Sequence, residues 1–456
     1  MFSAFKKFGR MGGGSSIPWT PTKLFAAGEA GGLWDFTTLA NLYQDSAGTT
    51  PCTAVGDPIG KVLDTSGRGN HLTQATSTKR PTLGRMPATG VRNLIVQSRQ
   101  FKQSPWTNFN YTTDNAALAP DGTMTAALSL SGTSGAPHDG QGIQEVPTAN
   151  VGTRRAVSLY VKQYTSPQVL FGIYDAGGWN GLAQVTFTVG APTITTANGT
   201  LISPTATDAG NGWWRVSFMC DAKSAGWAGF YIYPETNTAS YDGKGTYIWG
   251  AQAELAAAPT AYQKVGAAYD VTESGVASVY TAYFDGVDDC LVSPSIDFSG
   301  TDAMSVFSGF RKTSDAARGM VAELSATTDS NNGSFALTAP NAASATIVYE
   351  SKGTSLTDTS ATIAAPADSV IAAVSDISAD SNVLRRNGAE AESDTGDQGT
   401  GNFGNYPIYV GQRGAASLPY KGFLSALCTR GAATDAATVT SMEKWMAART
   451  PGVTLP

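Results

Sequence analysis

Trp213-Trp-Arg-Val-Ser-Phe-Met219 has the composition of a β-strand, because aromatic and β-branched residues fill it and the turn-forming Gly210-Asn-Gly212 precedes it. Similar short runs recur between clusters of Gly, Asn, Asp and Pro: Arg155-Ala-Val-Ser-Leu-Tyr-Val161, Val169-Leu-Phe-Gly-Ile-Tyr174 and Gly245-Thr-Tyr-Ile-Trp249. Such runs are typical of antiparallel sandwiches. The sequence shows no repeat of fixed period, which disfavours a solenoid or a propeller. The sequence therefore predicts an all-β protein.

One segment departs from this pattern, and it lies near the end of the chain. From Asp435 to Arg449, the apolar residues Val439, Met442, Trp445 and Met446 fall on one face at helical spacing. Thr434 or Asp435 can cap the first turn, and Pro451-Gly452 ends the helix. We expect a single C-terminal helix.

The composition limits the classes of function. The 456 residues suffice for two or three domains, and charged residues make up 14 %, against roughly 25 % in an average soluble domain. A surface so poor in charge is typical of rigid, loop-rich β proteins that work outside cells. The net charge of −6 predicts no general attraction to nucleic acid or anionic membranes. The four cysteines show no metal-binding spacing, and we expect them to be buried as small apolar residues.

The N-terminal residues 1–20 form a separate unit in this interpretation. Phe2, Phe5 and Phe8 recur every three residues, which suits one face of a short helix docking in a groove of a partner protein. The alternative is a disordered terminus. Gly12-Gly13-Gly14-Ser15-Ser16 follows as a flexible hinge, and no apolar run of signal-peptide length or membrane-spanning length is found, so we expect no signal peptide and no membrane insertion.

The central block, residues 92–264, resembles the jelly-roll carbohydrate-binding modules of phage tail and head proteins. The matching segments, in order along the chain, are Arg92-Asn-Leu-Ile-Val-Gln-Ser-Arg-Gln-Phe101 with Trp106, Ala119-Pro-Asp-Gly-Thr123, Val157-Ser-Leu-Tyr-Val-Lys162, Gly210-Asn-Gly-Trp-Trp-Arg-Val-Ser217 and Tyr247-Ile-Trp-Gly-Ala-Gln-Ala-Glu254. Their order and spacing cover the block, and the set is more specific than any single segment.

The C-terminal block resembles a concanavalin A-like (laminin-G type) sandwich. The matching segments are Tyr283-Phe-Asp-Gly-Val-Asp-Asp289, Met304-Ser-Val-Phe-Ser-Gly-Phe310, Ile408-Tyr-Val-Gly-Gln-Arg413 and Tyr420-Lys-Gly-Phe-Leu-Ser-Ala-Leu427. In related phage proteins, the segment from Leu33-Trp-Asp35 to Arg80-Pro-Thr-Leu83 leads directly into the Phe-Asp-Gly strand. We therefore expect one discontinuous sandwich, residues 21–91 plus 265–456, with residues 92–264 inserted in it.

The resemblance implies a fibre or head-spike protein of a bacteriophage or gene transfer agent. Its implied role is non-catalytic attachment of the virion to polysaccharide on the bacterial surface or capsule, with the N-terminus anchored to capsid or tail proteins. Because single sandwich sites are weak, adhesion implies a homo-oligomer, with a trimer as first choice and a pentamer as second. Two alternatives stay open: a purely structural decoration or baseplate protein, and a capsule-depolymerising tailspike.

Aromatic side chains are the expected contacts with a sugar, since their faces stack on the apolar patches of a pyranose ring. Five residues of the central block are the carbohydrate-binding candidates: Trp106, Trp179, Trp227, Tyr231 and Tyr233. In the Trp213-Trp214 pair, the pleat sends one ring into the core and the other outward. The resemblance also implies a core position for Trp249. The alternative for loop tryptophans is burial against a neighbouring subunit.

Acidic residues allow two further interpretations. Asp285, Asp288 and Asp289 are weak candidates for structural calcium, with a tight hairpin turn and solvated carboxylates as the alternative. No cofactor is otherwise expected. A glycosidase would need two carboxylates at hydrolytic separation, for which Glu145, Asp175, Asp208 and Glu254 are conceivable members. Turn formation and solvation are the alternative for all four, and we expect no enzymatic activity.

Overall fold

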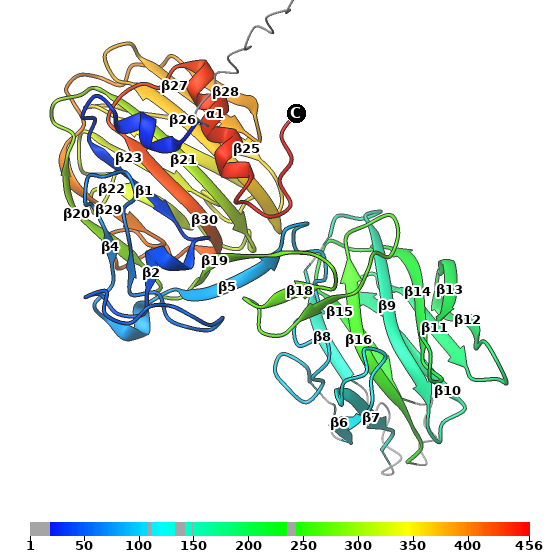
Figure 1. The fold of residues 1–456 in the computed structure, drawn as a ribbon. Helices are drawn as coiled ribbons and strands as arrows, with labels where there is room; N and C mark the ends of the chain where they lie inside the picture. Colours follow the sequence, from blue (N-terminus) through cyan, green and yellow to red (C-terminus); the bar gives the residue numbers. More distant parts are fainter. Residues whose placement is uncertain (1–18, 108, 110, 133–141, 148, 235–242) are drawn as a thin grey trace, which may run out of the picture.

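The computed structural model describes residues 19–107, 109, 111–132, 142–147, 149–234 and 243–456. Two β-sandwiches lie side by side (Figure 1). We call residues 19–91 and 265–456 the terminal sandwich and residues 92–264 the middle sandwich. The predicted all-β class with antiparallel sandwiches is confirmed. The predicted virion anchor, Phe2, Phe5 and Phe8, lies outside the described residues.

The terminal sandwich is built from two antiparallel sheets. The first sheet contains, in spatial order, β28 (Ala389–Asp394), β27 (Ser381–Arg386), β26 (Ala367–Asp376), β21 (Ala303–Lys312), β30 (Lys421–Arg430), β19 (Ser278–Asp285) and β5 (Thr82–Pro87), with β1 (Gly31–Asp35) also paired to β30. The second contains β2 (Leu42–Tyr43), β3 (Lys61–Val62), β4 (Leu72–Thr73), β20 (Leu291–Asp297), β29 (Asn405–Val410), β22 (Met320–Leu324), β23 (Ser334–Thr338), β24 (Thr346–Lys352) and β25 (Leu356–Thr362).

Strands from both ends of the chain share these sheets. Trp34 of β1 lies opposite Leu427 of β30, and Leu83 of β5 lies opposite Ala282 of β19. Large buried side chains from both sheets fill the space between them, among them Trp34, Phe284, Phe310, Tyr349 and Tyr420. A short 3-10 helix at Pro21–Phe25 precedes β1, and two others, at Leu39–Asn41 and Ser77–Lys79, lie between N-terminal strands.

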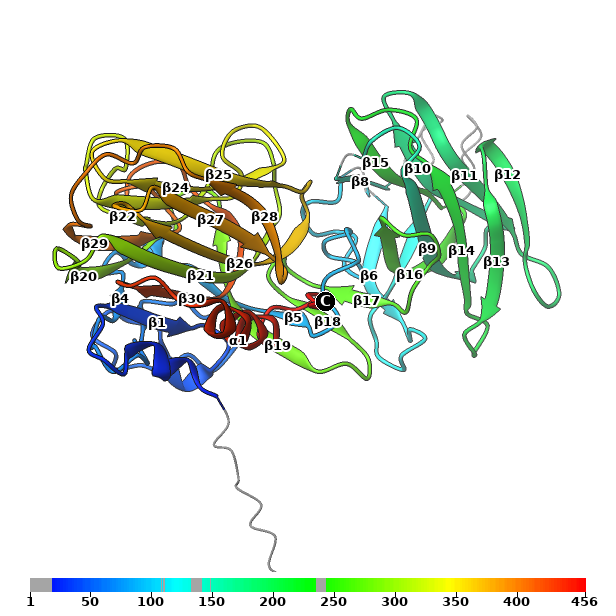
Figure 2. The same ribbon diagram turned by 90° about the horizontal axis from the view of Figure 1, so that it is seen from above.

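The α-helix found among the described residues, α1 (Ala436–Ala447), covers the outer side of the first sheet (Figure 2). Asp435 caps it by accepting hydrogen bonds from the main-chain N–H groups of Ala437 and Thr438, at 3.1 and 3.0 Å. Val439, Met442 and Met446 are buried against the sheet. The predicted C-terminal helix and its Asp435 cap are thus confirmed. Among the described residues, no helix has the length and apolar character needed to cross a membrane.

The middle sandwich also has two antiparallel sheets. Its five-stranded sheet contains β12 (Thr193–Gly199), β11 (Gly178–Thr186), β10 (Gln168–Asp175), β15 (Ala228–Tyr233) and β8 (Gly142–Val146). Its six-stranded sheet contains β13 (Ile202–Asp208), β14 (Trp214–Asp221), β9 (Arg154–Gln163), β16 (Gly245–Glu254), β7 (Ala126–Leu130) and β6 (Thr112–Ala117). Phe171, Phe218, Phe230 and Ile248 are fully buried between the two sheets.

The neighbouring tryptophans Trp213 and Trp214 pack in two different apolar clusters. Trp213 is 1 % exposed and its indole N–H donates to the Leu118 carbonyl, whereas its neighbour Trp214 is only half-buried. Trp249 is 4 % exposed. Trp249 and Trp213 are buried with Ala119 and Ala126 in a cluster separate from the core between the two sheets, and it is Trp214 that packs against that core. The burial predicted for Trp249 and for one member of the pair is found, but neither ring lies between the sheets. All four cysteines (Cys52, Cys220, Cys290 and Cys428) are buried free thiols, as predicted.

The chain passes between the sandwiches twice, and the amide of Gln263 connects the two passages. Its Oε1 accepts hydrogen bonds from the main-chain N–H groups of Arg92 (2.7 Å) and Asn93 (3.2 Å). Its Nε2 donates to the Gly90 carbonyl (2.9 Å) and to a carboxylate oxygen of Glu273 (3.0 Å). Gln263 is fully buried, so these groups have no water to replace the amide.

Ion pairs surround this amide. Arg92 Nη2 lies 2.7 Å from Glu273 Oε1, and Arg85 Nε lies 2.6 Å from Asp270 Oδ1. Burial opposes ionisation of Glu273, but hydrogen bonds from Gln263, Arg92 and Thr89 outweigh it and hold its pKa below the ordinary value. The hairpin of β17 (Gln263–Val265) and β18 (Val271–Glu273), which forms the second passage, is therefore fixed to the first passage around Arg92.

We expect Gln263→Met to lower the free energy of unfolding by about 2–4 kcal/mol, because each unpaired buried polar group costs about 1–3 kcal/mol. Urea unfolding followed by tryptophan fluorescence measures the change. Gln103→Met is the matched control, since Gln103 is exposed, and its effect should stay within about 0.5 kcal/mol. Wild-type stability of Gln263→Met would contradict the role assigned to this amide.

Candidate functional site

The pleat of β15 sorts its aromatic residues onto two faces. Phe230 and Ile232 point into the core of the middle sandwich, whereas Tyr231 and Tyr233 lie on the outer face of the five-stranded sheet. β10 follows the same rule, with Phe171 in the core. A second apolar cluster therefore forms on the outside of this sheet, opposite the core.

We call the five outer aromatic residues the aromatic face: Tyr174, Trp179, Trp227, Tyr231 and Tyr233. The ring of Trp179 lies 5.3 Å from that of Tyr174 and 5.3 Å from that of Tyr231, both edge to face. Tyr231 and Tyr233 are stacked at 6.3 Å with an angle of 14° between their planes, and Trp227 lies 6.3 Å from Tyr231. Four of the five predicted carbohydrate contacts thus lie together.

Gly229 leaves room between these rings. Gly229 on β15 pairs with Tyr174 on β10, and Gly172 on β10 pairs with Tyr231 on β15. A Cβ at Gly229 would come within 2.9 Å of the Trp227 ring and 3.1 Å of the Tyr231 ring. Glycine within a strand is usually unfavourable. Here the absence of a side chain at Gly229 leaves the space that the neighbouring rings occupy.

Trp227 is the most exposed ring of the aromatic face, with 40 % of its surface open to solvent. Its indole N–H donates to a carboxylate oxygen of Glu145 at 2.6 Å. Glu145 lies on β8, opposite Gly229 in the pairing of the two strands. This hydrogen bond fixes the indole plane and places a carboxylate at the edge of the aromatic face.

Asp175 fixes the backbone around Trp179. Its carboxylate is fully buried and accepts hydrogen bonds from the main-chain N–H groups of Gly177, Lys223 and Ser224 at 2.8–3.0 Å and from the Asn180 amide at 2.7 Å. Burial opposes ionisation, but these four bonds outweigh it and hold the pKa of Asp175 below its ordinary value. Asp175 is therefore a structural anion that joins the turn before Trp179 to the loop before Trp227.

Two of the predicted carbohydrate contacts require correction. Trp106 is 6 % exposed, packs against Phe101, Phe109 and Phe230 in the core, and donates its indole N–H to the Gln97 carbonyl. Its ring is therefore not available to a ligand, and that prediction is wrong. Tyr233 is 4 % exposed and supports the neighbouring rings from below instead of presenting its own face.

Tyr174 is a member of the aromatic face that was not among the predicted contacts. It ends the run Val169-Leu-Phe-Gly-Ile-Tyr174, and two-residue alternation from Phe171 and Ile173 places it on the outer face. The signal was present, but which face of the strand meets the core was not known from sequence.

The other two conceivable catalytic carboxylates also have structural partners. Asp208 accepts a hydrogen bond from the Gly210 N–H at 2.8 Å and so forms the turn between β13 and β14. Glu254 is buried, accepts from the Thr260 N–H at 3.0 Å, and lies 3.8 Å from Arg92. Asp208 fits the expectation of turn formation. Glu254 is buried, so the expectation of solvation is wrong for this residue.

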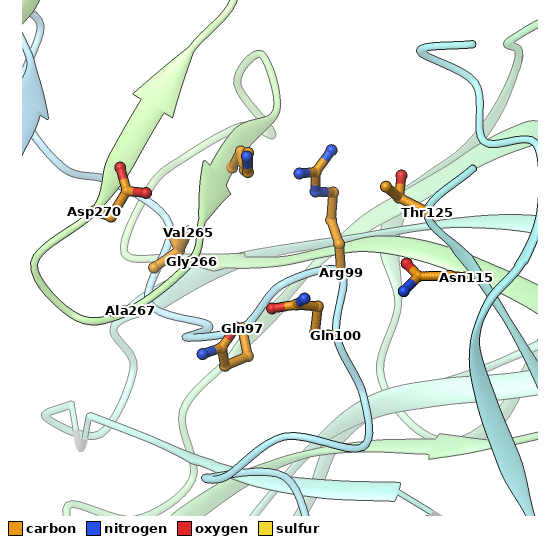
Figure 3. Close-up of a pocket in the computed structure, with 10 residues that line it drawn as sticks. Gln97, Arg99, Gln100, Asn115, Thr125, Val265, Gly266, Ala267 and Asp270 are labelled. Atoms are coloured by element: carbon orange, nitrogen blue, oxygen red, sulfur yellow. The ribbon is translucent and has the colours of Figure 1, made fainter. Parts of the chain in front are cut away.

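A polar pocket of about 270 Å³ lies apart from the aromatic face, between the middle sandwich and the β17–β18 hairpin (Figure 3). Arg99 projects from the 97–100 loop on one side, and Asn115 and Thr125 lie across from it. Gly266 and Asp270 of the hairpin form another wall. No pattern in the sequence points to this pocket.

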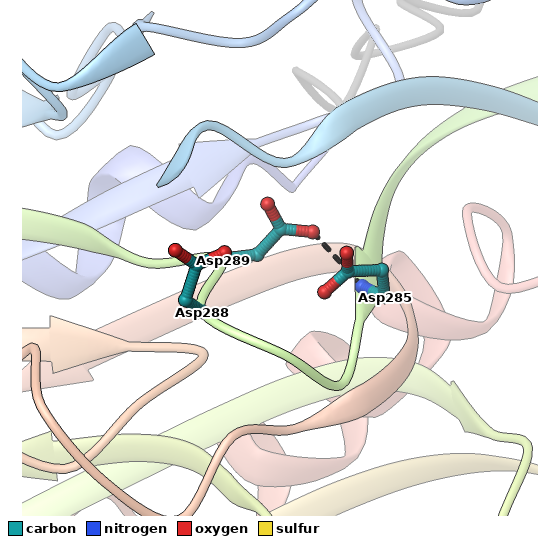
Figure 4. Close-up of side chains that lie close together, drawn as sticks. All are labelled: Asp285, Asp288 and Asp289. Atoms are coloured by element: carbon teal, nitrogen blue, oxygen red, sulfur yellow. Dashed lines mark hydrogen bonds between the residues drawn. The ribbon is translucent and has the colours of Figure 1, made fainter. Parts of the chain in front are cut away.

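Asp285, Asp288 and Asp289 do lie together, as their candidate role in calcium binding requires (Figure 4). One oxygen from each lies within 4.8 Å of the others. They do not form a hairpin turn, because β19 and β20 belong to different sheets and this segment connects them. Asp289 is buried and not solvated, and its carboxylate accepts the Asp285 N–H at 2.9 Å. Calcium takes six to eight oxygen ligands, so its binding here stays a prediction.

Burial, together with the charges of Asp285 and Asp288, raises the pKa of Asp289 to about 7. An unfolded Asp ionises near pH 3.8, so this group removes stability progressively as the pH rises from about 4 to about 7. We expect Asp289→Asn to unfold at a higher temperature than wild type at pH 8 and at a similar temperature at pH 4. Thermal unfolding in EGTA-containing buffer checks this. A constant difference at both pH values would contradict the assignment.

Comparisons with known proteins give structural likeness only. No protein-family model matches the chain, and no curated protein matches its sequence. Among solved structures, it is similar to the sialidase CBM40 of Ruminococcus gnavus bound to α2,3-sialyllactose, at 13 % identity over 31 % of this chain and 83 % of that chain, with a TM-score of 0.27.

Two further structures share this partial likeness. Domain 4 of the arabinanase AbnA from Geobacillus stearothermophilus, in complex with arabinotriose, is 16 % identical over 36 % of this chain and 76 % of that chain, with a TM-score of 0.29. The receptor-binding domain of botulinum neurotoxin type G is 10 % identical over 36 % of this chain and 42 % of that chain, with a TM-score of 0.29. Such scores carry no argument about ligand or activity, so the candidate site rests on its own geometry.

Proposed function

We propose that the protein binds a saccharide on the aromatic face, without chemical change to it. The observation that carries this proposal is the grouping of Trp179, Trp227 and Tyr231, partly exposed, on the outer side of one sheet. Aromatic faces offer large apolar contact at low cost in conformational entropy. Rings held by neighbouring rings and by Asp175 are ordered before a ligand arrives, which favours affinity.

Polar groups at the same face supply hydrogen bonds for sugar hydroxyls. Burial, followed by the neighbouring Tyr174 phenol, raises the pKa of Tyr231, so its hydroxyl keeps its proton at neutral pH and can donate. The Glu145 carboxylate has acceptor capacity beyond the single bond from Trp227. Aromatic stacking combined with an acceptor and a donor suits a pyranose, whose C–H groups form apolar patches on the ring faces and whose hydroxyls lie around the ring.

We expect Trp179→Ala and Tyr231→Ala each to weaken polysaccharide binding at least tenfold, about 1.4 kcal/mol, because each removes a stacking surface. Binding to an array of purified bacterial capsular and cell-surface polysaccharides is the measurement. Tyr164→Ala is the matched control, since Tyr164 is a 48 % exposed tyrosine of the same sandwich that lies outside the aromatic face. Wild-type binding by both variants, with unchanged thermal stability, would exclude the aromatic face as the site.

We further propose that this binding attaches a virion of a phage or gene transfer agent to its host. The support is the resemblance of both sandwiches to fibre and head-spike modules and the low charge of the chain. Weak single sites gain useful avidity when several copies act together. A homo-oligomer is therefore part of this proposal, with a trimer preferred over a pentamer.

Light scattering of the purified chain should give three times the 47.2 kDa chain mass, or five times for a pentameric spike. Particles should adsorb to encapsulated cells and not to capsule-free cells of the same strain. Equal adsorption to both would favour the structural decoration or baseplate alternative. Release of oligosaccharides from purified capsule would show that the protein is a depolymerising enzyme.

A further inference from the structure

The pocket of Figure 3 is lined mostly by hydrogen-bond donors and cations. Arg99 and Lys264 both reach it, and the amides of Gln97, Gln100 and Asn115 add polar groups from the middle sandwich. Among the described residues that line it, the acidic one is Asp270, which already has an oxygen 2.6 Å from Arg85. The charges that remain free to act on a ligand are therefore positive.

The two cations are balanced differently. Arg99 lies 3.1 Å from Asp121, a pair that is partly exposed and therefore weak. For the Lys264 ammonium, neither a hydrogen bond nor an ion pair is found within the described part of the chain. Partial burial, followed by the charge of Arg99, lowers the pKa of Lys264. Two like charges that face the same space without full compensation are stabilised when an anion lies between them.

An unpaired acceptor adds a second requirement. The Oε1 atom of Gln97 is buried and has no hydrogen-bond partner in the described structure. Gln97 and Asn115 also have positive φ angles, 52° and 56°, which non-glycine residues rarely adopt. The Gln97 carbonyl accepts from the Trp106 indole and from the Gln100 N–H, and these bonds hold the loop in place. A ligand here should carry a donor such as a hydroxyl in addition to its negative charge.

Arg99 and Lys264 also line a neighbouring hollow of about 280 Å³, where Trp249 and Tyr262 lie. The Arg99 guanidinium lies 5.8 Å from the centre of the Trp249 ring. The two cations therefore stand between two adjacent hollows. Each is slightly smaller than the ~300–1,000 Å³ typical of ligand pockets, a size that suits a single sugar unit.

We infer that this pocket binds the carboxylate-bearing unit of an acidic saccharide. Arg99 and Lys264 contact the carboxylate, and the side-chain Oε1 of Gln97 accepts a hydrogen bond from a ring hydroxyl. The inference rests on the proposed function for the class of ligand, a saccharide, and it places a second site away from the aromatic face. Binding of a charged sugar unit in this pocket makes the protein select acidic polymers among the saccharides that the aromatic face can bind.

The test uses the full chain and two monosaccharides that differ in one group. We expect sodium D-glucuronate to bind saturably and at least tenfold more tightly than D-glucose, by isothermal titration calorimetry at low salt. Lys264→Gln and Arg99→Gln should each weaken glucuronate binding at least tenfold. Lys23→Gln, the same change of charge at an exposed position of the terminal sandwich, should leave it unchanged.

The Trp179→Ala variant separates this inference from the proposed function. Glucuronate binding should persist in that variant, because Trp179 is not among the residues that line the pocket. Equal affinity for glucose and glucuronate would overturn the inference, and so would loss of glucuronate binding in Trp179→Ala. Unchanged affinity in both Lys264→Gln and Arg99→Gln, each with wild-type thermal stability, would overturn it as well.

Discussion

The whole arrangement depends on keeping two passages of the chain together. The segment around Arg92 leaves the terminal sandwich, and the β17–β18 hairpin returns to it. The buried Gln263 amide bonds both of them and the Glu273 carboxylate. Because the terminal sandwich takes strands from both sides of this junction, its own sheets close only when these passages meet. A small polar network thus fixes the position of one sandwich relative to the other.

Strand alternation then determines where ligands can be met. On β15 the same four residues supply two core side chains and two outer aromatic rings. Exposing the apolar rings of Trp179, Trp227 and Tyr231 to water is unfavourable in free energy. Edge-to-face packing between the rings and the hydrogen bond from Trp227 to Glu145 reduce this penalty. The result is an ordered apolar surface with polar groups at its margin, which suits an amphipathic ligand such as a sugar ring.

Local patterns predicted much of this architecture but none of its long-range pairings. Residue types and turn clusters predicted the all-β class, and spacing and capping predicted α1. No local pattern specifies that Trp34 pairs with the strand of Leu427; only the resemblance suggested a sandwich shared by both ends. For the site, composition identified Trp179, Trp227 and Tyr231, yet it also selected Trp106, whose indole finds a core partner in the Gln97 carbonyl. The pocket of Arg99 and Lys264 joins residues far apart in sequence, and it could be found only in three dimensions.

The buried thiols have a practical meaning for the chemistry of the whole molecule. Burial raises the pKa of Cys52 and of Cys220 to about 12 and raises that of Cys290 and Cys428 too, so all four stay protonated and poorly nucleophilic at neutral pH. The four cysteines form no disulfide with one another. A cysteine introduced at an exposed position would be the single thiol open to alkylation, so one fluorophore can be attached at a chosen place without removing any native residue.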